Sequence, residues 1–176
     1  MRIKARMGMS VDGYVATTDG LPSLIMAEGF VPGESHGFPE FIDGCDAVVM
    51  GRHTFVPALG APQWPWGDMR VFVLTSSPLP AAAPDGVVAA ASVAELVQRL
   101  RARGSGGDVH LVGGPRTIQA FSQQGALDSL EVVVLPILLG DGIPLWPRET
   151  ARPRLRLRHQ PRVFPDGSAE LSYSTT

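Results

Sequence analysis

Short, apolar, β-branched segments alternate with longer segments of helical character along most of this chain. Four of the short segments fit strands, at residues 46–50, 71–75, 109–112 and 130–135. Runs this short and apolar are typical of strands that are covered on both faces, as in a parallel sheet. Because they alternate with helical segments, the pattern predicts an α/β fold.

Two helices have clear start signals. Residues 92–103 open with Ser92 and Glu95, which form a capping box, and then repeat apolar side chains at helical spacing. Residues 115–125 open with Pro115, a residue that suits the first turn of a helix. We therefore expect each helix to follow a strand and cover the sheet.

The end of the chain has a different pattern. Residues 163–173 have strand character on both sides of the turn-forming segment 165–168, which predicts an antiparallel hairpin beside Leu155 and Leu157. The predicted sheet is therefore mixed, with an antiparallel C-terminal edge. The loops at 57–67 and 79–86 are short, so we expect a single domain over residues 1–176.

Composition excludes several classes of protein. The 176 residues have a formal net charge of -2, whereas binding nucleic acid or an anionic membrane by bulk electrostatics needs a basic excess. Cys45 is the one cysteine, which favours a reducing cytoplasmic setting and the role of a small half-buried filler. No apolar run approaches the ~20 residues of a spanning helix, and the four histidines are scattered. We expect a soluble protein without a metal site.

Three predicted strands end in residues suited to phosphate. Glycine and arginine follow the first within residues 51–55, hydroxyls follow the second at 75–77, and a glycine pair precedes a helix within 113–117. Glycine lets a phosphate approach the backbone, and a helix start offers free N–H groups. Because ligands of open α/β sheets lie beyond the carboxyl ends of the strands, these segments suit an extended polyanion such as a dinucleotide. Neither G-x-G-x-x-G nor the P-loop motif occurs.

Five motifs occur in the order seen in one known superfamily. They are SVDGYVA at 10–16, VMGRHTF at 49–55, VLTS at 73–76, VGG at 112–114 and LPILLGDG at 135–142. In these motifs the chain resembles the dihydrofolate reductase-like superfamily, and most closely its RibD C-terminal branch, the reductase domain of riboflavin biosynthesis. The resemblance implies a three-layer α/β/α fold with a mixed, mostly parallel sheet. It also implies a homodimeric, NADPH-dependent reductase of a small pterin- or pyrimidine-like heterocycle, as in the 5-amino-6-(5-phosphoribosylamino)uracil reductase of that branch.

The same resemblance assigns residues to the cofactor. Arg52 and Thr54 with the hydroxyls at 75–77 would bind its phosphates, the 2′-phosphate included, and the glycine pair with the following helix start would bind the pyrophosphate. The full set of candidates is Gly51, Arg52, His53, Thr54, Leu74, Thr75, Ser76, Ser77, Val112, Gly113, Gly114, Pro115, Arg116 and Thr117.

The substrate side leaves alternatives open. The acidic residue that dihydrofolate reductases carry on their first helix corresponds in spacing to Ser35, so the neighbouring Glu34 is one candidate acid. Asp12 is the other, and a carboxylate in an Asp-Gly segment also serves to stabilise a turn. A position occupied by Ser35 in place of an acid also suits a catalytically degenerate protein that binds a dinucleotide or acts as a dimeric scaffold.

Two further patterns have competing interpretations. Residues 33–37 match the G-x-S-x-G nucleophile elbow, but residues 28–32 before them resemble a loop where that motif needs a strand, so an esterase using Ser35 is a remote alternative. Alternating arginines form one face of a predicted strand, as a solvated edge or as a basic patch for an anionic partner. They are Arg152, Arg154, Arg156 and Arg158.

Overall fold

The computed structural model describes residues 1–104, 106–147 and 153–175, and its chain forms two compact units. The first unit comprises Met1–Ala5 and Gly44–Asp128, and the second comprises Arg6–Asp43 and Ser129–Thr176. Strand β1 (Ile3–Ser10) runs from the first into the second, and each unit is described by itself.

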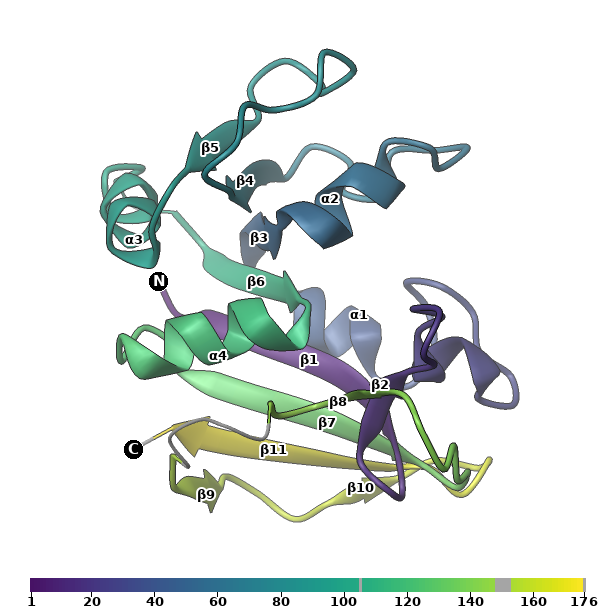
Figure 1. The fold of residues 1–176 in the computed structure, drawn as a ribbon. Helices are drawn as coiled ribbons and strands as arrows, with labels where there is room; N and C mark the ends of the chain where they lie inside the picture. Colours follow the sequence, from purple (N-terminus) through teal and green to yellow (C-terminus); the bar gives the residue numbers. More distant parts are fainter. Residues whose placement is uncertain (105, 148–152, 176) are drawn as a thin grey trace. The chain divides into compact units, whose positions relative to one another are not determined.

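The first unit contains the parallel part of the sheet. Its strands are β1, β3 (Cys45–Gly51), β4 (Arg70–Leu74), β5 (Val88–Ala90) and β6 (Asp108–Gly113), in the order β1-β6-β3-β4-β5 (Figure 1). Every neighbouring pair in this series is parallel. The three strands predicted here from short apolar runs are confirmed, whereas β1 and β5 were not predicted.

The centre of this sheet is almost completely inaccessible to solvent. Val48, Val49 and Met50 of β3 are fully buried, as expected of a strand covered on both faces. Phe55 packs with Val48 and Met50, and half-buried side chains from the segments after α2 and β4 cover the same cluster. The predicted loop at 57–67 begins two residues inside α2, and side chains of this loop and of the one at 79–86 contribute apolar cover to the core of their own unit.

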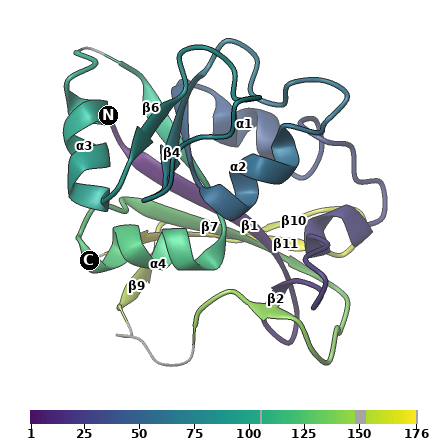
Figure 2. The ribbon, with the colours of Figure 1, turned by 45° about the horizontal axis from the view of Figure 1, so that its top comes forward.

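Three helices belong to the first unit: α2 (Arg52–Ala58), α3 (Val93–Arg101) and α4 (Pro115–Gln123). Helix α2 contacts β3 and β4, α3 contacts β4 and β5, and α4 contacts β6 (Figure 2). The predicted cap of α3 is confirmed, since the Ser92 hydroxyl accepts a hydrogen bond from the Glu95 N–H at 3.2 Å. Helices α3 and α4 each end two residues before the predicted boundary.

The second unit contains the antiparallel part. Strands β7 (Ser129–Leu135) and β11 (Ala169–Thr175) pair over six positions. Strands β9 (Leu155–Leu157) and β10 (Arg162–Val163) both pair with β11, and the order is β10-β11-β7-β1. The predicted C-terminal hairpin is thus confirmed, and with the first unit it establishes the mixed, mostly parallel sheet.

Smaller elements complete this unit. Strands β2 (Tyr14–Ala16) and β8 (Ile143–Pro144) form a two-stranded sheet, and η1 (Ser23–Met26) and α1 (Phe38–Ile42) follow β2. All three residues of β9 are exposed, in agreement with a solvated edge strand. Arg152 of the predicted arginine face lies outside the described residues.

The second unit also buries a charged cluster. The Arg6 side chain is 3% exposed, and its guanidinium donates to Glu131 at 2.6 Å and to Glu170 at 2.9 Å. It also donates to the carbonyl of His36 and lies 5.6 Å from the centre of the Phe41 ring. These contacts compensate the desolvation of the arginine, which a buried position otherwise makes costly.

Across the ranges that the structure describes, none of the helices has the length and hydropathy that crossing a bilayer demands.

Candidate functional site

The carboxyl ends of three strands in the first unit are neighbours. Gly51 at the end of β3 is in register with Leu74 of β4, and Met50 is in register with Gly113 of β6. All fourteen residues predicted to bind the cofactor lie at these ends or in the segments that follow them. The structure therefore brings together, within one unit, the segments that the sequence separates by more than sixty positions.

The backbones of β3 and α4 approach closely at Gly51. A Cβ atom placed on Gly51 would lie 2.6 Å from Oγ1 of Thr117 and 4.0 Å from the carbonyl oxygen of Gly113. Gly51 has φ of -79°, which any residue can adopt, so glycine is required here by the space and not by the backbone conformation.

Helix α4 starts directly after the glycine pair. Gly114 is its N-cap residue, no side chain caps it, and Pro115 occupies its first turn. The Thr117 N–H bonds to the Gly114 carbonyl at 2.9 Å, and the Thr117 side chain is buried against Gly51. An uncapped helix start of this kind presents partial positive charge to a ligand at the same strand ends.

Arg52 connects the ends of β3 and β4. It is the first residue of α2, it is half-buried, and its Nη1 donates to the Pro78 carbonyl at 2.7 Å. A guanidinium carries five N–H donors in a planar fork, so this bond leaves others for an anion. His53 is exposed and Thr54 is half-buried on the same helix.

The three hydroxyls after β4 are not equivalent. Oγ1 of Thr75 accepts from the Ser77 N–H at 3.1 Å and donates to the Ser77 carbonyl at 3.2 Å, which closes a local turn. Ser76 and Ser77 are exposed. The side chains of Ser76 and Ser77 are therefore the more available donors for a phosphate.

The two candidate acids belong to the second unit. Asp12 accepts hydrogen bonds from the N–H groups of Leu139 at 3.2 Å and Gly140 at 2.7 Å. A hydrogen bond from the Ser10 hydroxyl is the largest cause that lowers the pKa of Asp12; burial opposes it, and the two backbone N–H groups add to the lowering. Asp12 thus stays ionised and stabilises the turn at 139–140. Glu34 is exposed, and its N–H bonds to the Val31 carbonyl at 3.1 Å.

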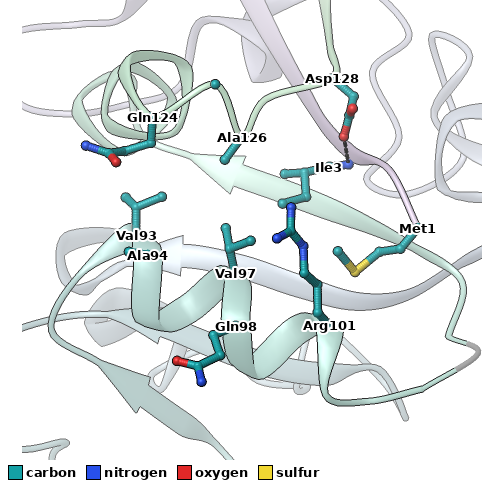
Figure 3. A pocket seen from close by; sticks show the side chains of 11 residues that line it. Met1, Ile3, Val93, Ala94, Val97, Gln98, Arg101, Gln124, Ala126 and Asp128 are labelled. Carbon is teal, nitrogen blue, oxygen red and sulfur yellow. Dashed lines mark hydrogen bonds between the residues drawn. The ribbon is translucent and has the colours of Figure 1, made fainter.

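A hollow of the first unit lies away from these residues. It has a volume of about 460 Å³ and is lined by α3, the start of β1 and residues 124–128 (Figure 3). Val93, Val97 and Arg101 of α3 point toward it, and the Asp128 carboxylate accepts the Ile3 N–H at 2.7 Å. It contains none of the predicted cofactor residues, which lie at the opposite ends of the strands.

Comparison with known proteins agrees with the architecture. The fold matches that of dihydrofolate reductase of Enterococcus faecalis with a TM-score of 0.68. The two chains are 19% identical, and the match covers 99% of this chain and 96% of that one. Residues 2–166 match the family described as the RibD C-terminal domain. The chain belongs to the RibD C-terminal domain family, so the predicted superfamily, branch and fold class are confirmed.

Individual relatives extend over nearly the whole chain. A putative riboflavin biosynthesis protein from Shewanella sp. PV-4 has a TM-score of 0.81 and 25% identity over 100% of this chain and 99% of that one. The uncharacterized protein YwjB of Bacillus subtilis (strain 168) is 29% identical over 154 residues, which is 86% of each chain. The family is one of reductases.

Proposed function

We propose that this protein is a reductase that uses NADPH to deliver hydride to a small pterin- or pyrimidine-like heterocycle. The observation that carries the proposal is the meeting of Gly51, Arg52 and the Gly113–Gly114 pair at adjacent strand ends. The names of two structural neighbours support this substrate class: one is a diaminohydroxyphosphoribosylaminopyrimidine deaminase/5-amino-6-(5-phosphoribosylamino)uracil reductase of Thermotoga maritima, of which this chain covers 56%, and the other is a dihydrofolate reductase. A single domain over residues 1–176, a homodimer and a cytoplasmic location are part of the same proposal.

The residues at the strand ends fit a dinucleotide for separate reasons. At Gly51 the missing side chain lets Oγ1 of Thr117 lie close to the backbone, and the start of α4, which no side chain caps, suits the pyrophosphate. Arg52 has donors left over after its bond to Pro78, and with Ser76 and Ser77 it would bind the 2′-phosphate. When bound, NADPH supplies the hydride, while the chain binds and orients it.

The proton that accompanies hydride transfer needs a separate source. Asp12 is poorly suited to donate this proton, because its hydrogen bonds favour the ionised form and each of its carboxylate oxygens accepts a backbone N–H. Glu34 remains the candidate acid on the substrate side.

Calorimetric titration with NADPH and NADH tests the cofactor. An arginine that binds the 2′-phosphate contributes a charge-assisted hydrogen bond of about 1.5–3 kcal/mol. Arg52→Ala should therefore weaken NADPH by roughly tenfold to a hundredfold and leave NADH nearly unchanged. Arg99→Ala is the matched control, because Arg99 is an exposed arginine of the same unit that pairs with Glu95 on α3.

The possible outcomes separate the hypotheses. Failure of the wild-type chain to bind either coenzyme would overturn the proposal, and equal losses of NADPH and NADH in Arg52→Ala would remove Arg52 from the 2′-phosphate. Tight binding of NADPH without oxidation by any pterin or pyrimidine tested would favour the degenerate dinucleotide-binding protein.

A further inference from the structure

Three side chains of the second unit form a continuous hydrogen-bonded series that the proposed reductase site does not use. Oγ of Ser35 lies 2.9 Å from Nδ1 of His36, and Nε2 of His36 lies 3.0 Å from Oδ2 of Asp166. Both distances fall within the reach that links a nucleophile, its base and the group that orients the base. Ser35 and His36 are adjacent in sequence, whereas Asp166 comes from the turn between β10 and β11.

The carboxylate at the end of this series is well defined. The Asp166 side chain is 7% exposed, and its other oxygen accepts from both the hydroxyl and the N–H of Ser168. Burial raises the pKa of Asp166, but hydrogen bonds from Ser168 and His36 outweigh it and hold the pKa below its ordinary value. In the neutral imidazole whose Nε2–H donates to the Asp166 carboxylate, Nδ1 faces the Ser35 hydroxyl as an acceptor.

His36 itself is held in place on all sides. Its side chain is 6% exposed, and its ring lies 6.3 Å from the centre of the Phe30 ring and 5.4 Å from that of Phe164. Arg6 donates to its carbonyl. Among the described residues His36 is the one non-glycine residue with a positive φ, at 54°. A positive φ is uncommon outside glycine, and residues that adopt one cluster at functional sites.

Ser35 is the accessible end of the series. It is half-buried, and its hydroxyl oxygen accepts from the Val31 N–H at 2.9 Å. With this lone pair occupied, its own proton can point to Nδ1 of His36 at 2.9 Å or to the Val31 carbonyl at 3.1 Å. A hydroxyl poised against a buried, oriented imidazole is the arrangement that activates a serine nucleophile.

We propose that Ser35, His36 and Asp166 form a second reactive site, next to the candidate acid Glu34 but without a part in hydride transfer, in which Ser35 accepts acyl groups from small esters. Oγ of Ser35 forms a bond to the ester carbonyl carbon while its proton passes to Nδ1 of His36. The bond from that carbon to the alcohol oxygen then breaks, and the alcohol leaves with the proton from His36. Water repeats the same steps, which releases the carboxylic acid and restores Ser35.

The local structure explains why the motif at 33–37 was insufficient by itself. The residues before Ser35 are turns and not a strand, so the hydrolase elbow is absent, as the sequence predicts. The base and the carboxylate come instead from the neighbouring residue and from a hairpin turn 130 positions away. Triads are recognised by geometry and role and not by sequence position or fold.

A fluorophosphonate probe applied to the full chain tests this site, with peptide mass spectrometry to locate the label. We expect the label on Ser35, and we expect its rate to fall at least about a hundredfold in His36→Asn, since a general base contributes ~10²–10⁴-fold. Asp166→Asn should also slow it, and this variant can still accept the hydrogen bonds of Ser168. The control is His159→Asn, which alters an exposed histidine of the same unit and should label at the wild-type rate.

Two measurements keep the test decisive. Thermal unfolding identifies any variant that has lost its fold, and hydrolysis of p-nitrophenyl acetate by the wild type, absent in Ser35→Ala, gives a second readout of acyl transfer. No label on Ser35, or a rate that His36→Asn and Asp166→Asn leave unchanged while folded, would overturn the proposal. Titration of the same variants with NADPH should match the wild type, so a failure here is distinct from a failure of the proposed reductase.

Discussion

Replacing Gly51 with alanine offers a sharp test of the close approach at the strand ends. The new methyl group would lie 2.6 Å from Oγ1 of the buried Thr117, whereas ordinary contacts of a Cβ atom begin at 3.4 Å. The two atoms must therefore separate by about 0.8 Å. The next nearest atoms are at 3.9 and 4.0 Å, so the Thr117 hydroxyl is the whole obstacle.

The expected cost follows from two opposing effects. Overpacking of a tight site costs about 1–3 kcal/mol. Replacing glycine by alanine where the backbone allows it returns about 0.4–1 kcal/mol, because the unfolded chain becomes less flexible. We therefore expect Gly51→Ala to lower the free energy of unfolding by about 1–2 kcal/mol in the wild-type background. In a Thr117→Ala background, where the obstructing oxygen is gone, the same change should cost nothing or stabilise.

Urea unfolding of the two single variants and the double variant measures this coupling directly. Gly60→Ala is the control, since its Cβ would meet its nearest atom, the Pro57 carbonyl oxygen, at an ordinary 3.5 Å. Equal effects of Gly51→Ala in both backgrounds would refute the packing argument.

Three other predictions concern the second unit. Arg6→Met should lower the free energy of unfolding in urea by about 3–5 kcal/mol, because it leaves Glu131 and Glu170 without their cation. Adding Glu131→Gln and Glu170→Gln should recover much of this loss. A mild effect of Arg6→Met alone would contradict the role of the charged cluster. The pKa of Asp166 is lower in the folded chain than in the unfolded chain, so the ionised carboxylate stabilises the fold fully above the ordinary pKa near 3.9 and loses this effect as the pH falls through the lower folded pKa. The difference in free energy of unfolding between the wild type and Asp166→Asn should therefore narrow only in acid. A difference that stays constant down to acid unfolding would contradict the lowered pKa. Asp12→Ala should speed amide hydrogen exchange at residues 139 and 140, and unchanged exchange there would show that the turn holds without the carboxylate.

The elements predicted correctly from the sequence share one property, which is that their buried positions are occupied by apolar residues. Strands β3, β4 and β7 contain the apolar runs 47–50, 71–74 and 132–135. The sequence does not predict strand β1, because its second and fourth residues, Lys4 and Arg6, are charged although both are buried. Arg6 can occupy a core position only because Glu131 and Glu170 compensate its charge, and those partners lie more than 120 positions away. No local pattern contains that information.

The two candidate sites differ in the same way in how far the sequence predicts them. Gly51 and the Gly113–Gly114 pair could be placed from the sequence because the carboxyl ends of parallel strands meet at one edge, so a residue's position after a strand already determines its surroundings. The contact of His36 with Asp166 depends instead on how a loop packs against a hairpin turn 130 positions away, and spacing within the sequence says nothing of it. The placing of residues at strand ends can therefore be predicted from a single sequence, whereas a cluster of side chains from distant segments requires the coordinates.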